Sequence, residues 1–97
     1  MKLEISEAAS EDAAAAAEFY EGRSRGLGEA FLAALDALFE HIVEHPMRYR
    51  VVRGPWRQAL LPRFPYSAIY RVEPDRIFVL AVMHGRRDPN VWRRRRT

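Results

Sequence analysis

The stretch YSAIYRV-EPDR-IFVLAVM, residues 66–83, contains the pattern that determines the fold. Its first part, Tyr66 to Val72, alternates between two sides of the chain, which is the period of a β-strand. The next four residues carry proline at the second position and predict a turn. Ile77 to Met83 is apolar almost throughout, as expected for a central strand that is covered on both faces. We therefore expect an antiparallel strand pair at the centre of a sheet.

Two shorter strands are predicted upstream of this pair. Tyr49, Val51 and Val52 indicate one of them, and Arg57 to Leu61 indicates the other. Gly54-Pro55 lies between them and predicts a turn. A further strand is expected at the N-terminus, where Lys2 to Ser6 alternates polar and apolar residues.

The first half of the chain predicts a helical hairpin. Ser6 is a favourable N-cap for an alanine-rich helix over about 7–21. A second helix is expected over about 27–45, with an apolar side that includes Phe31 and Leu35, and Pro46 ends it. The order is β-α-α followed by three or four strands, so we expect a single α+β domain with the hairpin packed on an antiparallel sheet.

Charge is segregated along the chain. Residues 1–47 hold ten acidic and three basic residues, whereas residues 48–97 hold thirteen arginines, no lysine and three acidic residues. This asymmetry favours an acidic partner, either a nucleic acid or an acidic protein segment. The final run Arg93–Arg96 is interpreted either as a solvated tail or as a nonspecific phosphate contact, and we expect the last five or six residues to be disordered.

Several classes of protein are excluded by composition. The 97 residues include no cysteine, which excludes a disulfide framework and a thiolate metal site. No glycine-rich phosphate loop follows a strand, so no nucleotide cofactor is expected. His41 and His45 have a metal-compatible spacing, but no convincing third ligand accompanies them, and we expect no metal. There is no membrane-length apolar run and no signal peptide, so we expect a cytoplasmic protein.

The candidate functional residues are mostly arginines of the second half. Arg57, Arg63 and Arg71 lie on successive predicted strands and, depending on register, could share a sheet face with Arg86 and Arg87. Such a surface would bind phosphate or carboxylate groups, the alternative being a solvated face with surface ion pairs. His84, where the central strand ends, is either a general acid or base or a histidine bonded to backbone.

Taken in order, short segments distributed over nearly the whole chain resemble ParE-type toxins of the RelE/ParE superfamily. The most specific are the sequence Arg63-Phe64-Pro65-Tyr66 and the spacing His84-x-x-Arg87-x-Pro89-x-x-Trp92. Additional matching segments are Glu18-Phe19-Tyr20, Leu27–Phe31, Ile42–Pro46 with Tyr49, Ile69-Tyr70 and Ile77–Val82. This resemblance implies the toxin half of a type II toxin–antitoxin pair, with the same β-α-α-β-β-β order. Its implied partner is an antitoxin that combines a ribbon-helix-helix part with an acidic tail.

The resemblance leaves the target open, because the fold is shared by two activities. ParE-like members are taken to inhibit DNA gyrase, whereas RelE-like members cleave mRNA on the ribosome. We favour gyrase inhibition, with target or antitoxin contacts at Arg57, Arg63, Arg71, Arg86, Arg87 and Trp92. In the alternative, ribosome-dependent ribonuclease, His84 is the acid and Arg63 or Arg71 holds the scissile phosphate. A toxin that has lost its activity and only binds its antitoxin is the third possibility.

Overall fold

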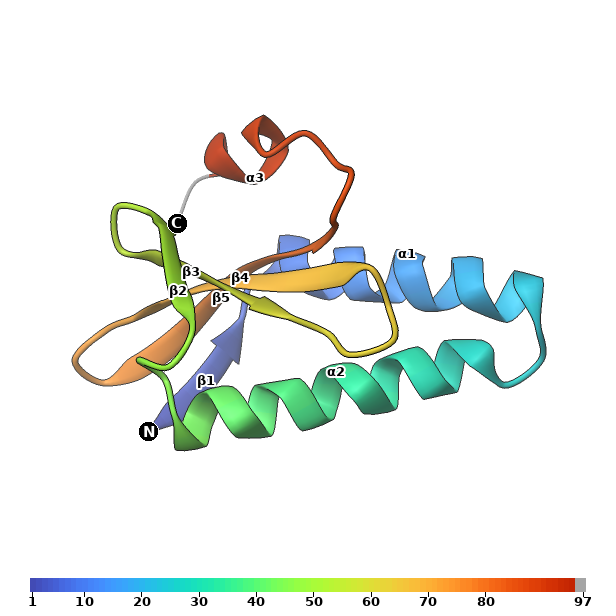
Figure 1. The fold of residues 1–97 in the computed structure, drawn as a ribbon, viewed down its shortest axis with the longest axis horizontal. Coiled ribbons are helices and arrows are strands. Elements are labelled where there is room, and N and C mark those ends of the chain that lie inside the picture. Colours follow the sequence, from blue (N-terminus) through green and yellow to red (C-terminus); the bar gives the residue numbers. More distant parts are fainter. Residues whose placement is uncertain (96–97) are drawn as a thin grey trace.

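The computed structural model describes residues 1–95. Its elements in chain order are β1 (Lys2–Ile5), α1 (Glu7–Arg23), α2 (Leu27–Glu44), β2 (Arg50–Arg53), β3 (Trp56–Leu60), β4 (Tyr66–Val72), β5 (Arg76–His84) and α3 (Asn90–Arg93). Figure 1 shows α1 and α2 as a long hairpin along one side of the sheet and α3 on the other side from α2. The predicted α+β class, with a helical hairpin on a largely antiparallel sheet, is confirmed.

The sheet has five strands in the order β1-β5-β4-β3-β2. The four strands after the hairpin pair with one another in antiparallel fashion, as the sequence predicts. In contrast, β1 pairs with β5 in parallel, from Lys2 opposite Arg76 to Ile5 opposite Val79. A parallel pair needs a long crossover connection, and the hairpin with the strands that follow it supplies that connection.

The hairpin is closed by small residues and by one carboxylate. A Cβ at Gly28 would lie 2.5 Å from the carbonyl oxygen of Ala17, so only glycine lets α2 approach α1 this closely. The Glu21 carboxylate accepts hydrogen bonds from the N–H groups of Gly26 and Gly28 at 3.0 Å each. It thereby satisfies donors that the first turn of α2 would otherwise leave without partners.

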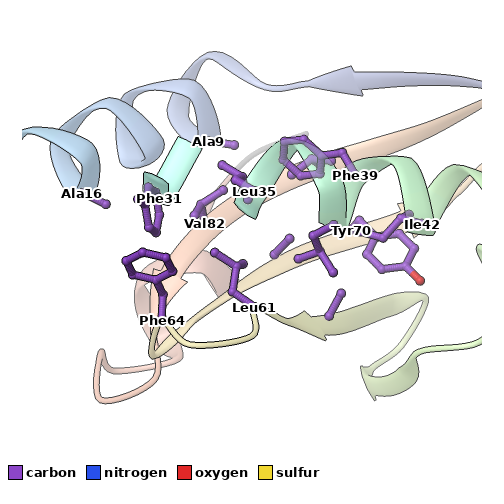
Figure 2. Close-up of a cluster of buried hydrophobic side chains, with 14 of the residues drawn as sticks. Ala9, Ala16, Phe31, Leu35, Phe39, Ile42, Leu61, Phe64, Tyr70 and Val82 are labelled. Carbon is purple, nitrogen blue, oxygen red and sulfur yellow. The ribbon is translucent and has the colours of Figure 1, made fainter. Parts of the chain in front are cut away.

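The main core lies between the hairpin and the sheet face that it covers, called here the hairpin face. Phe31 and Ile42 of α2 are fully buried there, as is Tyr70 of β4. Figure 2 shows Phe31 next to Phe64, and their ring centroids are 5.3 Å apart in an edge-to-face arrangement. The Tyr70 hydroxyl donates to the carbonyl oxygen of Pro46 at 2.6 Å, which joins the sheet to the end of α2.

A bulge in β5 lets this strand contribute to both faces of the sheet. Ile69 lies opposite Ala81 but Tyr70 lies opposite Val79, so Leu80 is an extra residue in β5. As a result, Val79 and Val82 both pack in the core of the hairpin face, while Leu80 and Ala81 both pack in a second cluster. The predicted covering of this strand on both faces is confirmed.

The second cluster lies on the opposite face of the sheet, called here the far face. It contains Ile69, Leu80, Ala81, Met83 and Trp92, and α3 supplies the tryptophan, which is 5% exposed. The rings of Trp92 and Trp56 are arranged edge to face, with their centroids 6.3 Å apart. A four-residue helix is held here by its buried side chain, because it is too short to be stable alone.

The segment after α3 differs from the disordered tail that we expected. The Arg95 guanidinium forms a two-pronged ion pair with Asp12 of α1, with N–O distances of 2.6 and 2.8 Å. The same guanidinium and the Ser6 hydroxyl each donate to the carbonyl oxygen of Leu80, and Asp12 accepts the N–H of Val82. The segment around Arg95 is held in place because the bulge leaves backbone groups of β5 without partners in the sheet, and Arg95 and Asp12 bond to those groups. Arg96 and Thr97 lie outside the described residues.

Candidate functional site

A pocket of about 390 Å³ opens on the far face, between the sheet and the segment that leads into α3. Its floor includes Ile69, Met83 and Trp92. Its polar lining comes from β2, β3, β4, the end of β5 with the turn that follows it, and α3, and consists of Arg50, Gln58, Ser67, His84, Arg87 and Arg93. We call this concavity the far-face pocket.

All charged side chains that line the far-face pocket are arginines, and none of its described residues is acidic. Arg50 comes from β2, Arg87 from the turn after β5, and Arg93 from α3. Within residues 1–95, every ion pair of an arginine with a carboxylate involves Arg71, Arg76 or Arg95, so the pocket's arginines have no carboxylate within 4.0 Å. The pocket therefore concentrates positive charge that the described chain does not neutralise.

The polar side chains on the floor form a short hydrogen-bonded chain. Arg50 donates to the side-chain oxygen Oε1 of Gln58 at 3.3 Å, and Nε2 of Gln58 donates to the Ser67 hydroxyl at 3.0 Å. Ser67 is 2% exposed, so its hydroxyl is fixed in the sheet below the pocket. The Gln58 amide still has one N–H and one lone pair for a ligand.

His84 stands at the edge of the pocket, where β5 ends. Its Nδ1 accepts the backbone N–H of Arg86 at 3.0 Å. A nitrogen that accepts a hydrogen bond carries no proton, so the neutral ring in this geometry holds its proton on Nε2 and offers a donor. The imidazole also packs edge to face on the Tyr66 ring, with the two ring centroids 5.2 Å apart. His84 is thus bonded to backbone, one of the two interpretations that the sequence left open.

The arginines predicted on successive strands do not come together. Arg57 faces the hairpin side, because it lies opposite Tyr70, and it donates to the carbonyl oxygens of Tyr49 at 2.7 Å and Met47 at 3.2 Å. Arg63 lies in the β3–β4 loop with a φ of +66° and is exposed. Neither residue lines the far-face pocket.

Arg71 lies on the far face but outside the pocket. It forms an ion pair with Glu73, and its guanidinium lies 5.0 Å from the Trp56 ring centroid and 5.3 Å from that of Phe78. Hydrogen bonds from Arg76, and then from Arg71, hold the pKa of the Glu73 carboxyl below its ordinary value. Arg71 is therefore part of a structural network of charges and rings.

Besides His84, three of the predicted residues are at or beside the pocket. Arg87 lines it, Trp92 supports its floor, and Arg86 is exposed in the adjoining turn. The sequence did not predict that four further residues of the pocket would come together, namely Arg50, Gln58, Ser67 and Arg93. Strand alternation could have placed Gln58 and Ser67 on one face, but joining them to Arg50 and Arg93 required the pairing of β2 with β3 and the position of α3.

A second concavity lies on the other side of the molecule and has a volume of about 290 Å³. It runs between α2, at Ala34 and Leu38, and the chain around Leu60 and Arg63. Leu60 is 69% exposed, an unusual state for a large apolar side chain beside a groove. We call it the α2 groove.

Clusters of metal-ligating side chains and membrane-spanning helices are both absent from the described residues. Between residues 1 and 95, no group of three or more His, Cys, Asp or Glu side chains is placed to hold a metal ion. In the same range, none of the helices has the length and apolar character needed to cross a bilayer.

Comparison with known proteins gives a consistent result. The family model described as the ParE toxin of the type II toxin–antitoxin system, parDE, matches residues 3–89. A chain of the solved chromosomal ParDE TA system from P. aeruginosa has the same fold, with a TM-score of 0.64 and 22% identity over 87% of this chain and 95% of that one. A search of curated proteins finds no match. Since the family model spans most of the sequence, the chain belongs to the ParE toxin family of type II toxin–antitoxin systems, in which the toxin has an antitoxin as its partner.

Proposed function

We propose that this toxin inhibits DNA gyrase by binding to it, without cutting nucleic acid, and that its antitoxin neutralises it. The observation that carries the proposal is the chemistry of the far-face pocket. It offers arginines and one histidine, and its described lining contains no carboxylate and no lysine. These groups favour binding over proton transfer.

Metal-free RNA cleavage needs a base to take the proton of the 2′-hydroxyl and an acid for the leaving oxygen. His84 in its hydrogen-bonded form can donate from Nε2 but cannot accept there, and the described lining of the pocket offers no carboxylate, lysine or tyrosine as a second acid–base group. The ribonuclease alternative also assigned the phosphate to Arg63 or Arg71. Arg63 lines the α2 groove, and Arg71 pairs with Glu73, so that assignment loses support.

The turn between β5 and α3 is the best-supported contact surface for the target. Arg86 is exposed, and the turn that carries it is held at both ends by His84 and by the buried Trp92. Exposed arginines on an ordered segment are common among the residues that dominate protein interfaces.

The test runs two assays on one purified preparation, gyrase supercoiling and mRNA cleavage in a translation extract. We expect supercoiling to stop and mRNA to stay intact. Arg86→Ala should raise the toxin concentration for half-inhibition about fivefold or more. Arg25→Ala, at an exposed arginine in the turn between α1 and α2, is the matched control and should leave that concentration unchanged.

Cut mRNA with active gyrase would overturn this proposal in favour of the ribonuclease, and His84→Ala would then abolish cleavage. An inert preparation that still binds its antitoxin would overturn it in favour of a toxin that has lost its activity.

The α2 groove is the surface where we expect the acidic antitoxin tail. An amphipathic segment could bury apolar side chains against Leu38 and Leu60 while its acids meet Arg63 at the rim. Leu60→Glu should therefore weaken antitoxin binding in a titration, whereas Val51→Glu, at a valine that is 52% exposed and lies outside the groove, should not. Equal effects of both substitutions would place the antitoxin elsewhere.

A further inference from the structure

We infer that the far-face pocket is a binding site for one nucleotide unit of a single-stranded nucleic acid. The inference goes beyond gyrase inhibition and does not rest on it, because it concerns what the toxin binds alone. It rests on arginines that have no carboxylate partner among residues 1–95, on the remaining hydrogen-bonding capacity of the floor and on the apolar surface between them.

The arginines supply the phosphate contacts. Arg50, Arg87 and Arg93 reach the pocket from three separate elements, so they surround it instead of lying along one edge. The Arg93 guanidinium lies 5.7 Å from the Trp92 ring centroid, a cation–π contact that positions it without using its charge on a carboxylate. A guanidinium can donate two parallel hydrogen bonds to a phosphate, which makes arginine well suited to a phosphodiester.

The floor can accept a base. Its volume of about 390 Å³ is within the range of about 300–1,000 Å³ for small-molecule pockets. Ile69, Met83 and Trp92 form a buried apolar floor, and the exposed side chains of Val51 and Pro89 continue this apolar lining, against which a base can pack. The Gln58 amide, held by Arg50 and Ser67, offers one donor and one acceptor, and the Nε2–H of His84 adds a donor.

This combination favours a single strand over the other acidic ligands. A duplex keeps its bases stacked, so it could reach the arginines but not the floor. An acidic peptide would satisfy the arginines but would leave the apolar floor and the Gln58 amide without a partner. An unstacked nucleotide, in contrast, uses the charged, polar and apolar parts of the pocket together.

The experiment measures binding of the full-length toxin, without gyrase, to fluorescein-labelled oligothymidylate by anisotropy over a range of salt concentrations. The same measurement with oligouridylate distinguishes DNA from RNA as the source of the strand. We expect Arg50→Ala and Arg87→Ala each to weaken binding about tenfold. Each should also reduce the magnitude of the slope of log association constant against log salt concentration by about 0.7, the value for one phosphate contact on a single strand.

Two exposed arginines provide matched controls. Arg53 lies on the same strand as Arg50, and Arg86 is adjacent to Arg87, yet neither lines the pocket. Arg53→Ala and Arg86→Ala should weaken binding no more than about twofold, because they act only through screened long-range charge. Circular dichroism checks that all four variants are folded, which we expect since every substituted side chain is exposed.

Three results would overturn the inference. Equal losses in the pocket variants and the controls would mean that binding follows diffuse charge. A duplex that binds as tightly as the single strand would mean that no base enters the floor. Polyglutamate of equal charge that displaces the strand would mean that the pocket selects anionic charge alone. None of these outcomes depends on whether gyrase is inhibited.

Discussion

The two faces of the sheet are built from the same strands but by different means. The hairpin face is covered by two helices of 17 and 18 residues and has a continuous apolar core. The far face is covered by one four-residue helix, a smaller cluster and a charged rim. The difference indicates that folding free energy comes mainly from the hairpin face, which leaves the far face free to carry groups that do not stabilise the fold.

The largest expected effect tests the hairpin face. Phe31 is fully buried and contacts the rings of Tyr20, Phe64 and Tyr66. Phe31→Ala should lower the free energy of unfolding in urea by about 3–5 kcal/mol. Phe19→Ala, at a phenylalanine that is 55% exposed, should change it by no more than about 0.5 kcal/mol. If the two variants were equally stable, the core assignment would be wrong.

A smaller effect is expected where the two faces are joined. Asp12→Ala removes the partner of Arg95 and leaves the N–H of Val82 without its acceptor. We expect the free energy of unfolding to fall by about 1–2 kcal/mol, because the side chains of Asp12 and Arg95 are only partly buried. Acrylamide should also quench the tryptophan fluorescence of this variant more strongly. Without the ion pair, α3 would be held less firmly against the sheet, and Trp92 would be more accessible to the quencher.

Glu18→Ala, at an exposed acid on the same helix, is the control for this second prediction. Its stability and quenching should equal those of the wild type. Unchanged quenching in Asp12→Ala would show that Trp92 holds α3 without the ion pair.

The smallest expected effects are changes of stability with pH. One residue on each face contributes, and the two contributions are lost in opposite directions of pH. Burial raises the pKa of Tyr70, on the hairpin face, to about 12. The unfolded chain therefore loses this proton first, and stability should fall as the pH rises above about 10. Glu73, which pairs with the far-face residue Arg71, has a pKa lowered by Arg76 and Arg71, so its contribution is present above about pH 4.5 and is lost below it.

Melting temperatures over the full pH range check both directions. Tyr70→Phe should flatten the alkaline decrease, and Glu73→Gln should flatten the acid decrease. A variant that flattens the opposite side, or neither, would contradict the assigned cause.

Elements with a local pattern could be predicted from the sequence. Such patterns depend only on near neighbours, and examples are the period of the α2 side chains, the alternation over Tyr66–Val72 and the proline at position 46. They predicted the bounds of the helices and strands to within a few residues. The resemblance carried by residues such as His84 and Trp92 gave the family, which the comparisons confirm.

Features that depend on distant pairing could not be predicted. The bulge at Leu80 has no local signal, because an apolar residue fits either face of a covered strand. Arg57 and Arg71 were candidates for one surface, but the register of β3 with β4 places them on opposite faces. Arg95 looks like part of a solvated run until Asp12, 83 residues earlier, is brought beside it.

The ion pair between Asp12 and Arg95 has a consequence for how the chain can be shortened. The part that matches the family model ends at residue 89, six positions before Arg95. A version trimmed to that shared part would lose Trp92 and Arg95 and would expose Ile69, Leu80 and Met83 to water. We therefore expect the residues that keep the far face covered to extend past the matched region, and truncated versions should be prone to aggregation.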